Sequence, residues 1–194
     1  MKRLFDIIIS LIALTVFTPL LFLISIAILV FDGLPIIFVQ PRLGKYKEEF
    51  NIVKFRTMNV GESKSSENDE MRQTILGKFL RKSSLDELPV LINVLKGEMS
   101  LVGPRPLLIK YSNRFNSFQN RRHEVLPGIT GLAQISGRNA ISWEEKFKYD
   151  VDYVENNSLF IDVCIIFRTL TKIFSSKDIN HEEDRTMPIF RQKK

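Results

Sequence analysis

Residues 7–31 read IIISLIALTVFTPLLFLISIAILVF, a run of 25 residues without a charge. A membrane helix needs about 20 apolar residues, so this run is long enough to cross a bilayer. A signal peptide has a shorter apolar core followed by a cleavage site of small residues, and this sequence matches neither feature. A buried helix of a water-soluble protein would also be shorter. The run therefore predicts an N-terminal membrane segment.

The dipeptide Thr18-Pro19 divides this run near its middle. Proline removes a helical hydrogen bond and clashes with the preceding turn, which predicts a kink, and the Thr18 hydroxyl could bond a freed carbonyl. Each half then spans roughly 18 Å, about one leaflet. Basic residues flank both ends, with Lys2 and Arg3 before the run and Arg42 after it, which places both ends in the cytoplasm. A re-entrant helix satisfies both observations, and the residues alone leave a kinked spanning helix open.

The rest of the chain predicts one compact, helix-rich α+β domain with a few short strands. The 194 residues, of which 44% are hydrophobic, suffice for a single core. We expect strands at 36–40 and 50–55 around a turn at Gly44, and helices at 71–81, 86–96 and 107–118. The expected division is a re-entrant membrane helix over 1–34, a cytoplasmic domain over 35–175 and a polar tail over 176–194.

Two amphipathic helices are expected near the C-terminus. Ser142 and Glu145 form a capping-box pattern that begins the first. Its apolar stripe is Trp143, Phe147, Val151 and Val154, and the second helix carries Phe160, Val163, Phe167, Leu170 and Phe174. Such a stripe usually packs in a core, but the second could instead lie in a membrane interface.

Composition excludes several classes of protein. The single cysteine, Cys164, rules out an internal disulfide, and two histidines, His123 and His181, provide no histidine metal site. The net charge of +6 favours an anionic partner, but no nucleic-acid-binding module is present. The basic stretch at 120–125 predicts a solvated surface.

Asp86 and Glu87 are the strongest candidates for chemistry, in the segment LDELPVLINVLKGEMSLVGPRP at 85–106. Ser84 and Glu87 match a capping box, but a helix beginning near Asp86 places Pro89 in the first turn, where proline is tolerated. Adjacent carboxylates repel each other, and Mg²⁺ shared with substrate phosphates would relieve the repulsion. A carboxylate can also act as a nucleophile.

Four basic residues are candidates for binding phosphate: Lys54, Arg56, Arg105 and Arg138. Arg105 lies between two prolines, which restrict the backbone and so aim its planar guanidinium. Arg138 lies in a glycine-rich segment, and glycines allow close approach of the backbone to a ligand.

Together these motifs resemble the bacterial sugar transferases, or monotopic phosphoglycosyl transferases. The resemblance covers nearly the whole chain and includes KRLFDIIIS, KFRTM, the 85–106 segment, PGITGLAQISGRN and the D-x-x-Y pattern of Asp150 and Tyr153. The length resembles the minimal catalytic form of the family. The resemblance implies transfer of a sugar-1-phosphate from a UDP-sugar to undecaprenyl phosphate, with Mg²⁺, at the cytoplasmic face of the bacterial inner membrane.

The resemblance also implies roles for individual residues. Asp86 would be the nucleophile that forms a phosphosugar-enzyme intermediate, and Glu87 would handle metal or protons. Lys54, Arg56, Arg105 and Arg138 would bind phosphate, and the helix would be re-entrant, with Thr18 in place of the family's usual serine. A non-catalytic membrane scaffold and a membrane-bound phosphohydrolase are the alternatives. The sugar and a homo-oligomeric state stay open.

Overall fold

The computed structural model describes residues 1–60, 72–137, 141–174 and 190. The N-terminal elements are α1 (Lys2–Phe31), β1 (Ile37–Leu43), η1 (Lys45–Lys47), β2 (Glu49–Phe55), α3 (Ile75–Lys82), η3 (Leu85–Val90), α4 (Leu91–Lys96) and β3 (Ser100–Val102), where η denotes a 3-10 helix. The C-terminal elements are η4 (Ile109–Tyr111), α5 (Ser117–Asn120), η5 (Arg121–His123), β4 (Gly128–Thr130), α6 (Leu132–Ser136), α7 (Trp143–Asn156) and α8 (Leu159–Phe174). The prediction of a helix-rich chain with few short strands is confirmed.

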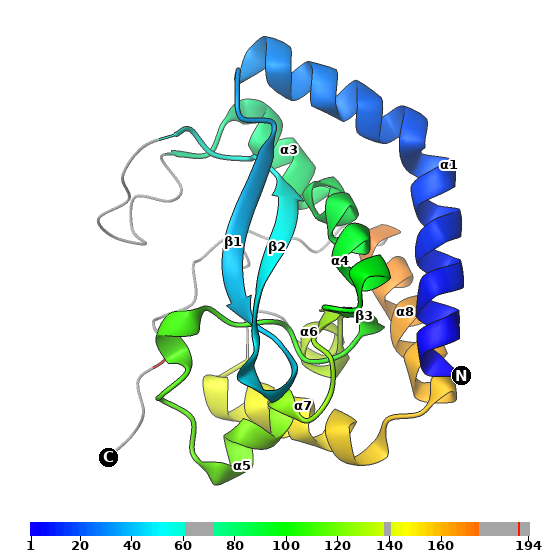
Figure 1. Ribbon diagram of the computed structural model, residues 1–194, viewed down its shortest axis with the longest axis vertical. Coiled ribbons are helices and arrows are strands. Elements are labelled where there is room, and N and C mark those ends of the chain that lie inside the picture. The colour runs from blue at the N-terminus through cyan, green and yellow to red at the C-terminus, as the bar shows by residue number, and fades with distance from the viewer. Residues whose placement is uncertain (61–71, 138–140, 175–189, 191–194) are drawn as a thin grey trace.

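Helix α1 runs along one side of the molecule and changes direction near its middle, where Pro19 lies (Figure 1). The Thr18 hydroxyl donates to the Leu14 carbonyl at 2.7 Å. The carbonyl that the missing Pro19 N–H would have bonded belongs to Thr15, so Thr18 serves the neighbouring carbonyl instead.

The inner face of α1 packs on the rest of the domain, and its outer face is not covered by any other described part of the chain. Ile24 and Ile28 are buried against Phe55 and Leu80. Its exposed apolar side chains include Leu4, Ile8, Leu11, Ile12, Val16, Phe17, Phe22, Leu23, Ile26, Leu29, Val30 and Phe31. Within the described ranges, α1 is the one helix long and apolar enough to cross a membrane. An apolar surface of this extent indicates association with a membrane.

Strands β1 and β2 form an antiparallel hairpin in the centre of Figure 1. The two strands predicted around Gly44 are confirmed and extend further toward the turn. The Gly44 amide donates to the Glu48 carbonyl at 2.8 Å, and a Cβ on Gly44 would meet that oxygen at 3.0 Å. Glycine therefore suits this tight connection.

A second, parallel pair of short strands, β3 and β4, was not predicted from the sequence. A Cβ on Gly128 would lie 2.0 Å from the Gly103 nitrogen, so this close approach requires glycine. The main core surrounds β3: Ile52, Val90, Leu91, Val94, Met99, Leu101, Val102, Ile135, Tyr153 and Ile165.

Two predictions are wrong. The segment 107–118 is not one helix, since it contains only η4 and the first residues of α5, and its aromatic residues Tyr111 and Phe115 turn into a separate core with Phe147 and Phe190. The stretch 120–125 is not simply a solvated surface, because Arg122 and His123 are buried. Arg122 pairs with an acid on α7, and the His123 ring contacts a backbone carbonyl, which allows burial.

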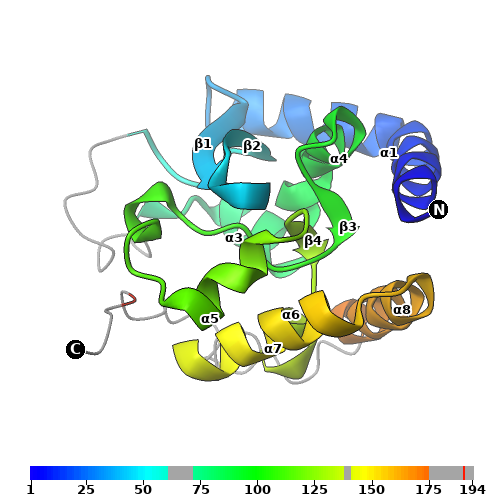
Figure 2. The same cartoon turned by 60° about the horizontal axis from the view of Figure 1, so that its bottom comes forward.

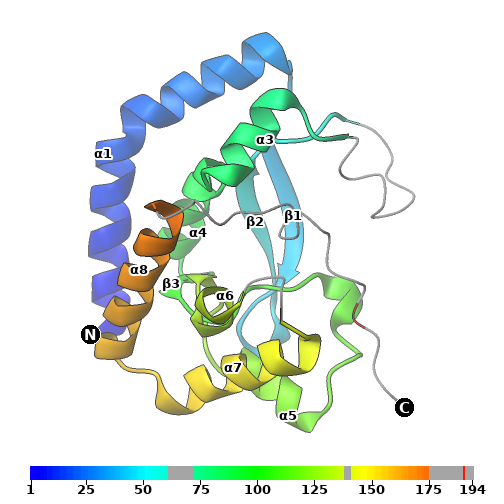
Figure 3. The same cartoon turned by 180° about the vertical axis from the view of Figure 1, so that it is seen from behind.

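The two C-terminal helices use their apolar stripes differently. The predicted capping box of Ser142 and Glu145 is confirmed at the start of α7, whose Phe147, Val151 and Val154 are buried. On α8 the stripe Phe160, Val163, Phe167 and Leu170 is exposed, whereas the side chain of Phe174 lies outside the described part. The two helices lie on the opposite side of the molecule from the hairpin (Figure 2). Seen from behind, the start of α8 lies near the N-terminal end of α1 (Figure 3), where Lys2 pairs with Asp162.

Candidate active site

The acid pair is held against strand β2 by a buried amide. Ser84 has a left-handed φ of 57° and its side chain makes no capping bond, so η3 begins at Leu85 without the capping box. In α4, the Asn93 side chain donates to the Asn51 carbonyl at 2.7 Å and accepts from the Val53 amide at 3.1 Å. Because Asn93 bonds β2 as a neighbouring strand would, it fixes α4 beside this strand, and η3 leads directly into α4.

Glu87 forms the centre of a three-residue ion cluster. Its Oε1 lies 2.6 Å from the Lys54 ammonium and 2.9 Å from the Arg105 guanidinium. Burial by itself would raise the pKa of Glu87, but the charges of Arg105 and Lys54 lower it below its usual range. Glu87 is therefore ionised and its charge is compensated.

Asp86 has a different environment, although it is the adjacent residue. Its side chain is buried, and burial followed by the charge of Glu87 raises its pKa from 3.8 to about 6, against the opposing effects of Lys54, Arg81 and Arg105. Asp86 is thus the more basic and the less compensated carboxylate of the pair.

Sequence reasoning missed two arginines near this pair. Arg42 from β1 lines the same small, open pocket as Lys54, Glu87 and Arg105. Burial, and then the charge of Arg105, lower the pKa of Arg42 to about 10, so it is a cation at neutral pH. Three cations and one carboxylate give this pocket a net positive charge, which suits a phosphate group.

The second missed residue is Arg81, which lies near the end of α3. Its Nε donates to the Thr57 hydroxyl at 2.9 Å, and its charge lowers the pKa of Asp86. No short-range pattern distinguished Arg81 or Arg42 from other surface arginines, because their role depends on which elements pack together.

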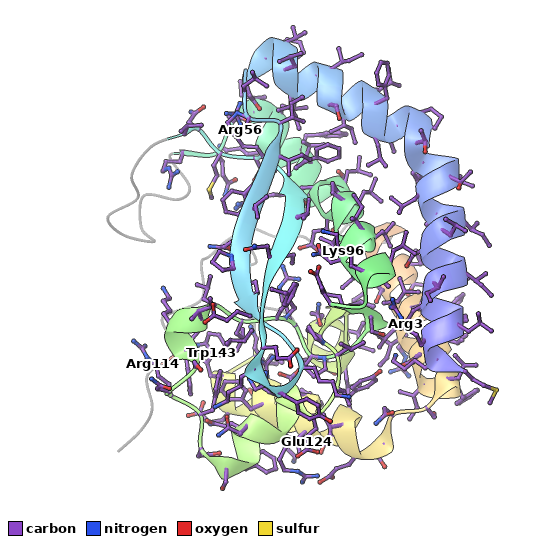
Figure 4. All side chains as sticks on the ribbon, viewed as in Figure 1. Arg3, Arg56, Lys96, Arg114, Glu124 and Trp143 are labelled. Atoms are coloured by element: carbon purple, nitrogen blue, oxygen red, sulfur yellow. The ribbon has the colours of Figure 1, made fainter. Side chains whose placement is uncertain are left out.

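The structure does not bring all the predicted phosphate-binding residues together. Lys54 and Arg105 meet at Glu87, but Arg56 lies beside the end of α1 (Figure 4). There its guanidinium donates to the carbonyls of Asp32, Gly33 and Leu34. Arg138 lies outside the described residues.

The donor set suits a magnesium ion that is shared with substrate. The described ranges hold no group of three His, Cys, Asp or Glu residues that could bind a metal on their own. Mg²⁺ is usually held by one or two carboxylates together with water and phosphate oxygens. Burial and the charge of Glu87 disfavour the ionised form of Asp86, so a bound cation would stabilise that form. One oxygen of Glu87 already pairs with the two cations Lys54 and Arg105.

Comparison with known proteins identifies the family. The family model described as bacterial sugar transferase matches residues 1–176. The "Uncharacterized sugar transferase EpsL" of Bacillus subtilis (strain 168) is 47% identical over 194 residues, covering 98% of this chain and 95% of that protein. The chain therefore belongs to the bacterial sugar transferase family, as its motifs indicated, and it is a transferase enzyme.

Other relatives carry more specific names. A UDP-glucose:undecaprenyl-phosphate glucose-1-phosphate transferase of Klebsiella pneumoniae is 41% identical, covering 91% of this chain and 40% of that protein. A UDP-N-acetylgalactosamine-undecaprenyl-phosphate N-acetylgalactosaminephosphotransferase of Aeromonas hydrophila is 38% identical, covering 90% of this chain and 44% of that protein. The chain thus spans less than half the length of these two relatives.

Proposed function

We propose that this protein transfers a sugar-1-phosphate from a UDP-sugar to undecaprenyl phosphate, as the first membrane step of a bacterial glycoconjugate pathway. The family and the names of two relatives support this donor and acceptor. The observation that carries the proposal is the asymmetry of the acid pair. Glu87 is compensated by Lys54 and Arg105, while Asp86 beside it is buried and has a raised pKa.

In the first step, a carboxylate oxygen of Asp86 attacks the sugar-bearing phosphorus of the UDP-sugar. A new oxygen–phosphorus bond forms, the bond between that phosphorus and the bridging oxygen breaks, and UMP leaves with the bridging oxygen. Lys54, Arg105 and Arg42 would face the diphosphate charge, because all three line the pocket at Glu87. Mg²⁺, when bound beside Asp86, would neutralise further charge on the phosphates.

In the second step, a phosphate oxygen of undecaprenyl phosphate attacks the same phosphorus. The bond to Asp86 breaks, which restores its carboxylate and yields the lipid-linked diphosphate sugar. Because the intermediate separates the two transfers, one site can serve a soluble donor and a membrane-bound acceptor in turn. A nucleophile with a pKa of about 6 is ionised at neutral pH and more basic than an ordinary aspartate.

A re-entrant α1 at the cytoplasmic face of the inner membrane completes the proposal. The first turn of α1 is bonded to the catalytic part through Lys2 and Asp162, and the residues that follow its end are bonded through Arg56. Both ends therefore contact the same part of the chain, which supports entry and exit on one side. The exposed apolar stripe of α8 would lie in the same interface.

The reaction is tested with purified protein, undecaprenyl phosphate, Mg²⁺ and a panel of UDP-glucose, UDP-galactose and UDP-N-acetylhexosamines. We expect UMP release that requires the lipid phosphate for sustained turnover, and no turnover with folded Asp86→Asn. With donor alone, mass spectrometry should find a sugar-phosphate adduct on the peptide that contains Asp86. Sustained UMP release without the lipid would indicate a phosphohydrolase, and no release with any donor would indicate a scaffold.

A further inference from the structure

The Pro-Arg-Pro turn is held by its carbonyl groups. Two of its three residues are prolines, which have no N–H to donate, so neighbouring donors must fix this backbone. Three different elements supply them: the Pro104 oxygen accepts from the Gly128 amide at 3.0 Å, the Arg105 oxygen from the Arg122 guanidinium at 2.7 Å, and the Pro106 oxygen from the Arg42 guanidinium at 3.2 Å.

Helix α7 supports the bond between Arg122 and the Arg105 carbonyl. Arg122 is buried, and its Nε and Nη2 lie 2.9 and 2.8 Å from one oxygen of Asp150, on α7. The same Nη2 donates to the Arg105 carbonyl. A buried guanidinium needs a compensating charge, so Asp150 keeps Arg122 in place, and Arg122 in turn holds the backbone of Arg105.

One helical turn further along α7, Tyr153 contacts the other end of the same backbone segment. Its buried hydroxyl lies 3.0 Å from the Val102 carbonyl and 2.6 Å from Asp162. The Lys2 ammonium donates to the Val102 carbonyl and to the Tyr153 hydroxyl as well. Residues three apart on a helix share one face, so one face of α7 restrains both ends of the 102–105 segment, directly at Val102 through Tyr153 and indirectly at Arg105 through Asp150 and Arg122.

We propose that Asp150 and Tyr153 are positioning residues that aim Arg105 at the reacting phosphate. This rests on the proposed function. The Arg105 side chain is 50% exposed, and among the described residues it pairs with Glu87. A long, half-exposed side chain has many rotamers, so its direction depends on a fixed backbone. The D-x-x-Y pattern supplies that backbone restraint from outside the pocket.

A double-mutant cycle tests whether Tyr153 acts through Arg105. Tyr153→Phe removes the hydroxyl and keeps the ring in the core, and we expect kcat to fall about tenfold. In an Arg105→Ala background the same change should alter kcat less than about twofold, because the group to be aimed is gone. Tyr149→Phe is the matched control on the same helix and should leave kcat unchanged. Equal losses from Tyr153→Phe in both backgrounds would overturn the proposal.

Hydrogen exchange tests, without any substrate, whether α7 restrains the backbone at residues 102–105. Asp150→Asn should speed amide exchange at residues 100–108 and leave the hairpin at 37–55 unchanged. Unchanged exchange at 100–108, or faster exchange throughout the chain, would show that α7 is an ordinary core helix. If Asp150→Asn does not fold, Tyr153→Phe gives the same measurement. An inactive wild type would refute the proposed function. An active wild type whose variants show no faster exchange at 100–108 would refute only the positioning role of Asp150 and Tyr153.

Discussion

Replacing Asp86 with Asn should stabilise the folded protein while it removes the proposed nucleophile. Burial, followed by the charge of Glu87, raises the pKa of Asp86 from 3.8 to about 6. A shift of about two pKa units, at about 1.4 kcal/mol per unit, corresponds to about 3 kcal/mol of instability above pH 7 that a neutral side chain avoids. For a chain of this size, that is a rise in melting temperature of roughly 6–12 °C.

The effect should depend on pH in a defined direction. Between pH 3.8 and about 6 the folded protein keeps the Asp86 proton while the unfolded chain releases it, so the stability gained from the neutral carboxyl falls as pH rises. Wild type and Asp86→Asn should therefore melt at similar temperatures near pH 4. The variant should gain its full advantage above about pH 7.

Thermal unfolding of wild type and variants in the same lipid nanodiscs, at several pH values, measures this difference. Glu87→Gln is the matched control, because the pKa of Glu87 is lowered in the folded protein by Arg105 and Lys54 despite its burial. Its loss should destabilise the protein at neutral pH. If Asp86→Asn melts at or below the wild-type temperature at neutral pH, or if Glu87→Gln stabilises equally, the assigned asymmetry of the pair is wrong.

Three further outcomes are expected. The rate of adduct formation from UDP-sugar without metal should fall below about pH 6, following the raised pKa of Asp86; a flat profile to pH 5 would exclude this group as the titrating nucleophile. Arg105→Lys should lower kcat/KM by roughly 10² to 10³, because an ammonium does not reproduce a planar fork, and near-normal turnover would assign Arg105 only a general charge effect. Arg56→Met should lower stability by about 2–3 kcal/mol, measured by thermal unfolding, because three carbonyls at the end of α1 lose their donor; unchanged melting would contradict the anchoring role of Arg56.

Local sequence determined the elements whose signals lie within a few residues. The apolar run predicted α1, the turn at Gly44 predicted the hairpin, and Ser142 with Glu145 predicted the start of α7. These features were predictable because helix length, strand alternation and capping depend on neighbouring residues. The acid pair and the Pro-Arg-Pro turn could also be singled out, since their chemistry is visible in adjacent residues.

Tertiary structure decided what each of these charged groups does. Lys54 and Arg56 are two residues apart, yet Lys54 pairs with Glu87 while Arg56, just beyond the end of β2, bonds the end of α1. Arg122 lies in a basic stretch that predicted a solvated surface, but Asp150 from a distant helix makes its burial possible. Asp86 and Glu87 are neighbours whose pKa values move in opposite directions. Charge interactions depend on distance in space and on burial, and packing between elements far apart in the chain sets both.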